Sequence, residues 1–347
     1  MPSATAPRTV VITGASAGLG RAIATAFARE GARIGIMARD QDRLAAVKKE
    51  VEQLGGQATV LVADVADPDA VEQAASVMEK TYGPIDIWVN NAMVSVFAPF
   101  HQTTAEEFRR VTEVTYLGTV YGTMAALRRM RPRNRGIIIQ VGSALSDRSI
   151  PLQSAYCGAK HGIRGFTDSI RCELIHDNSS IQLTMVQLPA MNTPQFSWVK
   201  SRLPNKPQPV PPIFQPEVAA DAVVWVSRHP RRELYVGMPT VQAMWGNKFF
   251  PGILDRYLGK TGYRKQQTAE PENPERPSNL WHPVPGDFGA HGTFDDRSQW
   301  HSVQVLLARK KWLLAGVATV AVAVAACATA AKSARPSRQF QLPPVFR

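Results

Sequence analysis

The stretch VVITGASAGLG, residues 10–20, constrains the fold of this chain more than any other segment. Its β-branched start predicts a buried strand, which is followed at once by Gly14, Gly18 and Gly20 and then by a helical pattern over residues 21–30. Glycine permits positive φ angles and close approach of the backbone to a ligand, and the free N–H groups at a helix start attract an anion. The stretch therefore predicts a turn that holds a dinucleotide, although a strand–helix turn without a ligand would also fit.

Strands and helices alternate along the chain as far as about residue 240. The expected strands after the first are 33–37, 58–63, 85–89, 136–141, 181–188 and 233–237, and the expected helices are 41–54, 68–82, 105–130, 154–176 and 216–228. This alternation predicts an α/β fold with a doubly wound parallel sheet and helices on both faces. Since ligands bind such sheets beyond the carboxyl ends of the strands, we expect residues 1–240 to form one binding and catalytic domain.

Residues 190–216 and 241–308 do not follow this alternation of strands and helices. Residues 190–216 carry seven prolines and the aromatic residues Phe196, Trp198 and Phe214, which together predict a lid. Residues 241–308 show no clear period, so we expect an irregular C-terminal extension with no assigned chemical role. The three cysteines have no metal-ligand spacing, and no metal site is expected.

The net charge of +12 belongs mostly to the end of the chain, because residues 309–347 hold seven Lys and Arg and no acidic residue. Residues 312–331 are uncharged and long enough as a helix to cross a bilayer. We therefore expect a membrane tail over 309–347, with the catalytic domain at the membrane in the cytoplasm and no nucleic-acid partner. A buried or self-associating helix is the alternative for this segment.

A candidate catalytic set follows the strand expected at 136–141. Ser143 lies just past that strand, and Tyr156 and Lys160 stand four residues apart on the next helix, so they share one helix face. A phenol ordinarily titrates near ~10, and an adjacent ammonium group would lower its pKa towards working pH. The set predicts general acid/base chemistry by Tyr156, with a hydroxyl from Ser143 on the substrate oxygen.

Taken in order, Thr13-Gly14-x-x-x-Gly18-x-Gly20, Asn90-Asn91-Ala92, Ser143 and Tyr156-x-x-x-Lys160 resemble the short-chain dehydrogenase/reductase family over about residues 8–240. The resemblance implies a Rossmann fold and hydride transfer between a nicotinamide cofactor and a carbonyl or alcohol. It also implies that Tyr156 transfers the proton, that Lys160 lowers its pKa and holds the nicotinamide ribose, and that Ser143 orients the carbonyl. A catalytically silent nucleotide sensor or scaffold of the same fold is the alternative.

The same resemblance implies a row of cofactor-binding residues along one edge of the sheet. They are Gly14, Ser16, Gly18, Leu19, Gly20, Arg39, Asp64, Val65, Asn91, Ala92, Tyr156, Lys160 and Thr193. Relatives that use NAD usually carry an aspartate where this chain has Ala38, whereas the neighbouring Arg39 suits a 2′-phosphate, so NADP(H) is favoured over NAD(H). Asp40 is expected to cap the next helix. Asp64 could likewise be only a cap, and Asn90-Asn91 only a turn.

The chain also departs from the family pattern. Thr115 stands where many relatives carry an asparagine that holds a water in a proton relay, and it is counted here with the catalytic residues. Met93 and Ala190 replace glycines and would narrow the site. The apolar residues nearby predict a lipophilic small-molecule carbonyl or alcohol as substrate. A homodimer or homotetramer is an expectation from the resemblance alone.

Overall fold

The structure is a computed structural model that describes residues 6–310. The segment 312–331, expected to span a membrane, lies outside the described residues. Within residues 6–310, no helix is both long and apolar enough to cross a bilayer. The chain divides into two compact units, Met1–Val305 and Leu306–Arg347, and the architecture described below is that of the first.

A seven-stranded parallel sheet forms the centre of this unit, in the order β12-β7-β6-β4-β1-β2-β3. Every neighbouring pair of these strands is parallel. The strands are β1 (Thr9–Thr13), β2 (Arg33–Ala38), β3 (Gln57–Val62), β4 (Ile87–Asn90), β6 (Ile137–Val141), β7 (Gln182–Gln187) and β12 (Glu233–Tyr235). The order reverses between β1 and β4, and such a switch point opens the crevice in which ligands bind. The predicted doubly wound α/β sheet is confirmed.

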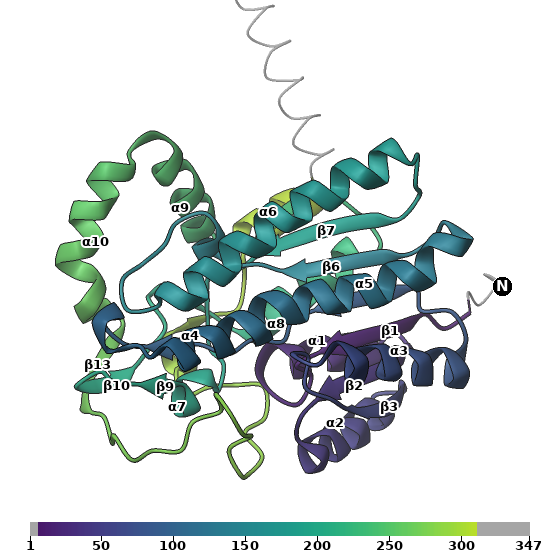
Figure 1. The fold of residues 1–347 in the computed structure, drawn as a ribbon, viewed down its shortest axis with the longest axis horizontal. Helices are drawn as coiled ribbons and strands as arrows, with labels where there is room; N and C mark the ends of the chain where they lie inside the picture. Colours follow the sequence, from purple (N-terminus) through teal and green to yellow (C-terminus); the bar gives the residue numbers. More distant parts are fainter. Residues whose placement is uncertain (1–5, 311–347) are drawn as a thin grey trace, which may run out of the picture. The chain divides into compact units, whose positions relative to one another are not determined.

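Helices cover both faces of the sheet. One group packs together as α1 (Gly18–Ala28), α2 (Gln41–Gln53) and α8 (Pro216–Val226), and the other consists of α3 (Pro68–Tyr82), α4 (Ala105–Val111), α5 (Gly118–Met130) and α6 (Ser154–His176). Figure 1 shows α3, α5 and α6 lying across the face that is turned towards the viewer. The core lies between these layers, where β1 is buried along its whole length and Trp88 and Phe27 are fully enclosed.

Local sequence signals set the starts of several helices. Asp40 caps α2 by accepting a hydrogen bond from the Arg43 N–H at 3.0 Å, as expected, and Asp67 caps α3. A capping box between Thr104 and Glu107 starts α4. The helix expected over 105–130 is continuous but contains a π-helical segment, Thr112–Leu117, between α4 and α5. Single π-helical turns are frequent at functional sites.

Residues 190–216 are more regular than the sequence suggests, and their role as a lid stays a prediction. This segment contains short elements: β8 (Ala190–Met191), α7 (Gln195–Trp198), β9 (Lys200–Ser201), β10 (Asn205–Pro207) and β11 (Ile213–Phe214). Phe196 packs edge-to-face against Phe97 and Phe294 in a small second core. The aromatic side chains of this segment are therefore buried, and β9 pairs with β5 (Val96–Phe97).

The expectation of an irregular extension over 241–308 is wrong for its first part. Two helices, α9 (Met238–Phe249) and α10 (Pro251–Lys265), stand beside the sheet in Figure 1. Only Thr240 is buried on α9 and only Gly262 on α10, so neither helix shows the apolar stripe from which a helix is predicted. Of the remaining elements, β13 (Gln267–Pro271) pairs with β10 and β14 (Ser298–Gln299) pairs with β11. The helix α11 (Val303–Arg309) follows them. The described residues also contain 3₁₀ turns at Phe100–Gln102, Arg131–Arg133, Ala144–Ser146 and Asp295–Arg297.

Candidate active site

A cavity of about 610 Å³ opens at the carboxyl ends of the central strands. This volume is typical of sites for small molecules and cofactors. All of the cofactor-binding residues expected from the sequence line it, from Gly14, Ser16, Gly18, Leu19 and Gly20 through Arg39, Asp64, Val65, Asn91 and Ala92 to Thr193. Ser143, Tyr156 and Lys160 line it as well. The sheet thus gathers residues that are up to 179 positions apart in the chain around one space.

The glycine turn at the start of α1 can be built only from glycines. Gly14 and Gly18 have positive φ angles of 68° and 57°, and a Cβ on Gly20 would lie 2.1 Å from the Gly14 carbonyl oxygen. Asn91 braces this turn, because its Nδ2 donates to the carbonyl oxygens of Thr13 and Gly14 at 2.9 and 3.2 Å. The turn is therefore held rigidly with its backbone facing the cavity, as a pyrophosphate site requires.

Asn90 is a structural residue behind the site. Its Oδ1 accepts from Trp88 Nε1 at 2.8 Å, and its Nδ2 donates to Gln140 Oε1 at 2.9 Å and to Thr123 Oγ1 at 3.1 Å. This buried network joins β4, β6 and α5. A Cβ on Gly122 would lie 2.2 Å from Asn90 Oδ1, so this glycine lets α5 approach the sheet closely.

The candidate catalytic set comes from β6 and α6. Ser143 follows β6, its backbone N–H donates to Gln187 Oε1 at 2.9 Å, and its Oγ accepts from the Leu145 N–H at 3.1 Å. The Tyr156 side chain makes a hydrogen bond with the side chain of Ser143. Ser143 and Tyr156 both line the cavity, so their hydroxyls lie side by side at its wall.

Lys160 is 3% exposed and lies beneath Tyr156. Its Nζ donates to the Val141 carbonyl oxygen at 2.7 Å and lies 5.5 Å from the centre of the Tyr156 ring. Burial lowers the pKa of Lys160 to about 8, and burial raises the pKa of the Tyr156 phenol above its ordinary value. The expected lowering of the Tyr156 pKa by Lys160 is not seen in this structure, because desolvation of the phenol is the largest effect on it.

Thr115 is placed apart from the other predicted residues. It lies on the π-helical segment, is fully buried, and does not line the cavity. Its Oγ1 donates to the Val94 carbonyl oxygen at 3.0 Å and accepts from the Val94 N–H at 3.1 Å. The side chain of Thr115 therefore fixes the loop after β4, whose residues Met93 and Val94 do line the cavity.

Basic residues surround the end of the cavity near β2. Arg39 follows β2, and its two terminal nitrogens donate to the backbone carbonyl oxygens of Trp281 and Asn279 at 2.8 and 2.6 Å. Asp64 pairs with Arg110 and accepts from the Ala66 N–H at 3.0 Å. Although burial opposes its charge, these two donors lower the pKa of Asp64 below its ordinary value. The carboxylate thus stays ionised at the edge of the site.

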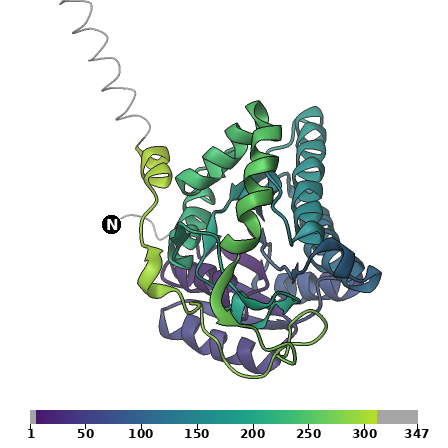
Figure 2. The same cartoon turned by 90° about the vertical axis from the view of Figure 1, so that its left-hand side faces the viewer.

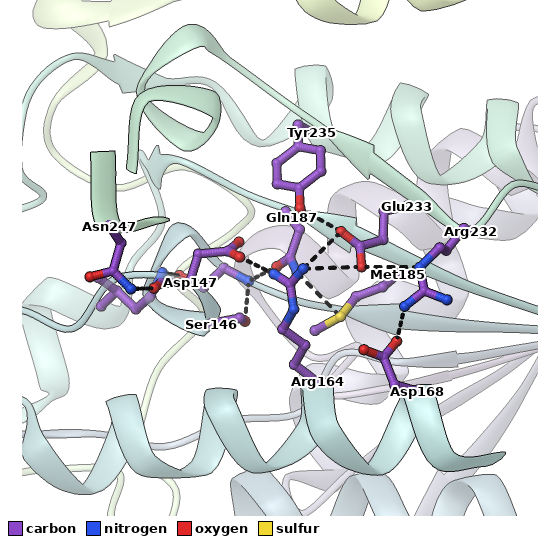
Figure 3. Close-up of polar contacts among 12 residues, drawn as sticks. Ser146, Asp147, Arg164, Asp168, Met185, Gln187, Arg232, Glu233, Tyr235 and Asn247 are labelled. Atoms are coloured by element: carbon purple, nitrogen blue, oxygen red, sulfur yellow. Dashed lines mark hydrogen bonds and ion pairs between the residues drawn. The ribbon is translucent and has the colours of Figure 1, made fainter. Parts of the chain in front are cut away.

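An ionic network holds the loop that carries Ser143. Figure 3 shows Arg164 of α6 between Asp147 and Glu233, and Tyr235 donating to Glu233 at 2.5 Å. Asn247 of α9 donates to the Asp147 carbonyl oxygen at 2.7 Å. Burial raises the pKa of Asp147 above its ordinary value. The loop after β6 is in this way tied to α6, to β12 and to the extension.

The far end of the cavity is apolar, and the part of its lining that comes from the extension was not predicted from the sequence. The residues concerned come from the extension, and those lining the cavity include Pro239, Ala243, Leu254, Tyr257 and Leu258. Met93, Phe97, Leu145, Ala190 and Phe196 face the same space from the sheet domain. Met93 and Ala190, which replace the usual glycines, thus add apolar side chains to the site as expected.

Residues 279–292, called the strap from here on, were also missed. In Figure 2 the strap belongs to the light green chain that runs along the lower edge of the sheet domain. Four arginines from four elements hold it: Arg39 binds the carbonyls of Asn279 and Trp281, Arg110 that of Leu280, Arg43 that of Val284, and Arg21 the carboxylate of Asp287.

The strap also makes apolar and backbone contacts with the site. Leu280 is fully buried, and Phe288 packs edge-to-face on Trp198 with 4.6 Å between ring centres. The Gly18 N–H, at the start of α1, donates to the Gly289 carbonyl oxygen at 2.9 Å. No periodic pattern marks this segment, which is rich in Pro and Gly, so sequence reasoning had no signal for it.

The family model described as short chain dehydrogenase matches residues 8–202 of this chain. Among curated proteins, the uncharacterized oxidoreductase YxnA of Bacillus subtilis is 34% identical over 274 residues, which are 78% of this chain and 77% of that protein. A fatty acyl-CoA reductase of Acinetobacter baylyi is 30% identical over 228 residues, covering 65% of this chain and 75% of the relative.

Solved structures agree with these relatives. The alcohol dehydrogenase of the archaeon Thermococcus sibiricus, solved in complex with 5-hydroxy-NADP, superposes with a TM-score of 0.57 and 28% sequence identity. The match covers 66% of this chain and 95% of that structure. The extension, with α9, α10 and the strap, comes after the residues that the family model matches.

Proposed function

This chain belongs to the short chain dehydrogenase family and is an NAD(P)-dependent oxidoreductase, and on that premise we propose that it uses NADP(H) to interconvert a carbonyl and an alcohol on a lipophilic substrate. The observation that carries the proposal is one cavity lined by the glycine turn, by Arg39 and by the Ser143, Tyr156 and Lys160 set.

The residues present fit a nicotinamide dinucleotide. The turn around Gly18 faces the cavity at the start of α1, where a pyrophosphate would be bound, and Arg39 stands at the end of β2, where an adenosine 2′-phosphate would lie. A guanidinium suits a phosphate because it offers several charged donors in one plane. When bound, the nicotinamide ring gives or takes the hydride.

Tyr156 is the proposed general acid/base. Its raised pKa keeps the phenol protonated in the free protein, which suits proton donation to a carbonyl oxygen during reduction. Ser143 shares a hydrogen bond with Tyr156, so both hydroxyls converge on one substrate oxygen and stabilise its developing charge. Lys160 would hold the ribose and place a positive charge beneath the phenol.

The substrate class follows from the apolar end of the cavity. Leu254, Tyr257 and Leu258 of α10 line it together with Phe97 and Leu145, so a hydrocarbon chain would be buried along its length. The fatty acyl-CoA reductase among the relatives acts on a molecule with such a chain, which supports the assignment. We infer an aldehyde, ketone or alcohol with a long apolar chain.

The first test is Tyr156→Phe, which removes the hydroxyl and keeps the ring. Turnover is measured with aldehydes and ketones of increasing chain length. We expect it to fall about a thousandfold, because the proton donor is lost. NADPH binding, followed by fluorescence titration, should change less than threefold. Unchanged turnover would remove Tyr156 from the mechanism, and NADPH binding by the wild type without turnover of any carbonyl would favour a nucleotide sensor.

Membrane association is part of the proposal. The apolar sequence of 312–331 supports it, as do the exposed side chains of Trp245, Phe249, Phe250 and Ile253 where α9 meets α10. Deleting residues 309–347 is expected to move the protein from the membrane pellet to the supernatant after cell lysis. Continued pelleting at unchanged yield of folded protein would count against the tail as an anchor.

A further inference from the structure

The strap, residues 279–292, makes several of its contacts with residues that line the dinucleotide end of the cavity. Gly18, Arg39, Arg43 and Trp198 all line this end, and each of them contacts the strap. Asn279 and Pro283 of the strap line the cavity themselves. The strap is therefore a wall of the site where the cofactor's adenosine and pyrophosphate would lie.

We propose that the strap encloses the bound dinucleotide and must open for the cofactor to enter or leave, with the Arg21–Asp287 ion pair and the Phe288–Trp198 contact as its latch. The inference rests on the proposed binding of NADP(H) in this cavity. It makes Asp287 and Phe288 positioning residues that set the exchange rate of the cofactor without touching it, since neither lines the cavity.

Each end of the strap is anchored to the backbone of the sheet domain. At one end Leu280 is fully buried and the Asn279 N–H donates to the Trp198 carbonyl oxygen at 3.0 Å. At the other end the Gly292 N–H donates to the Asn192 carbonyl oxygen at 3.2 Å, and a Cβ on Gly292 would come within 2.6 Å of the Thr193 carbonyl oxygen.

Between these two ends the chain is more exposed, and it contains two glycines at which the backbone can change direction. Residues 285–287 are exposed, and Gly286 and Gly289 adopt positive φ angles of 103° and 63° on either side of the latch. A segment with few buried contacts opens at low free-energy cost. The middle of the strap can therefore lift while both ends stay in place, once Asp287 and Phe288 release their partners and the bonds from Arg43 to Val284 and from Gly18 to Gly289 break.

Arg39 couples the strap to the cofactor. A guanidinium group has five N–H donors, and two of those of Arg39 are used by the carbonyls of Asn279 and Trp281. The remaining donors are available to a 2′-phosphate, so the same side chain can bind both the phosphate and the closed strap. Closure is then expected to be tighter over NADP(H) than over NAD(H).

The experiment measures NADPH association and displacement from the full-length protein by stopped-flow fluorescence, in the wild type, Asp287→Asn and Phe288→Ala. Glu270→Gln is the matched control, since Glu270 forms an exposed ion pair with Lys206 in the same extension but outside the strap. Each strap variant is expected to raise both the association and the dissociation rate about fivefold, as for loss of a partly exposed contact. The control should leave both rates unchanged.

The association and dissociation rates of NADPH together distinguish a gate from a purely electrostatic effect. Removing the negative charge of Asp287 near an anionic cofactor would by itself speed association and slow dissociation, whereas an opened gate speeds both. Phe288→Ala removes the aromatic ring without changing any charge, so its two rates test the gate independently of the electrostatic effect. Dissociation rates equal to the wild type in both variants would overturn the strap proposal, even where NADPH binds and carbonyls are reduced.

Hydrogen exchange of peptides covering 279–292 gives a readout that does not depend on turnover. NADPH is expected to slow exchange there, and NADH at saturation is expected to slow it less. Equal exchange with and without bound NADPH would overturn the proposal. If neither dinucleotide bound to the wild type, the proposed function would fail together with the strap proposal. The fluorescence titration of NADPH would show that result directly.

Discussion

Lys160 is the residue whose ionisation most affects the site, because it is buried beneath Tyr156 and its pKa falls to about 8 in the free protein. Its ammonium form donates stronger, charge-assisted hydrogen bonds to a ribose than the neutral amine does. NADPH affinity is therefore expected to be highest below pH 8 and to fall above it, by up to about tenfold per pH unit. Isothermal titration between pH 6.5 and 9.5 measures this.

Two variants make that pH dependence specific to Lys160. Lys160→Met should bind NADPH more weakly at every pH and lose the fall above pH 8, whereas Lys206→Met, at an exposed position, should keep it. A wild-type affinity that stays constant from pH 7 to 9.5 would show that the charge of Lys160 does not contribute to binding.

Single residues of the site could be predicted where their chemistry is local. The glycine turn, Ser143 and Tyr156-x-x-x-Lys160 all line one cavity because their spacing places them at strand ends and on one helix face. The environment of each group could not be predicted. The hydroxyl of Thr115 is taken by the Val94 backbone, and burial raises the pKa of Tyr156, both consequences of packing between distant segments.

At the scale of elements, His291 joins the far end of the strap to α8 and to the turn at Asp295. Its Nε2 lies 2.8 Å from Glu217 Oε1 and its Nδ1 2.9 Å from Asp295 Oδ1. Burial opposes its charge, but these two carboxylates raise the pKa of His291 above its ordinary value. The charged form is therefore favoured by folding.

The raised pKa of His291 makes the free energy of unfolding depend on pH in one direction. A raised pKa in the folded state adds stability that is fully present below the unfolded pKa near ~6.5 and is lost as the pH rises through the folded value. The free energy of unfolding of the wild type should exceed that of His291→Gln by about 0.5–1 kcal/mol near pH 6 and by less at pH 8.5, after discounting for solvent exposure. Urea denaturation at both pH values checks this, and a difference that grows with pH would contradict it.

Elements with a repeating apolar pattern were predicted, and those without one were not. The strands and helices of the central sheet follow the expected order with shifts of a few residues at their ends. α9 and α10 each have a single buried residue, so no periodic stripe marks them. The strap is held by arginines from α1, α2, α4 and the end of β2, and such long-range bonds to backbone carbonyls leave no trace in the local sequence.

At the scale of the whole molecule, the sheet domain and the extension form one compact unit, Met1–Val305, so a ligand that bridges them should stabilise both. NADPH at about 100 times its dissociation constant adds roughly 2.7 kcal/mol, which corresponds to a rise of roughly 5 °C in the unfolding midpoint. NADH at the same concentration should give a smaller rise, because the contact between Arg39 and the 2′-phosphate is missing. In Arg39→Gln the two cofactors should give equal shifts, and a preference for NADPH that survives this substitution would place 2′-phosphate recognition elsewhere, with Arg43 as the next candidate on the same wall of the cavity.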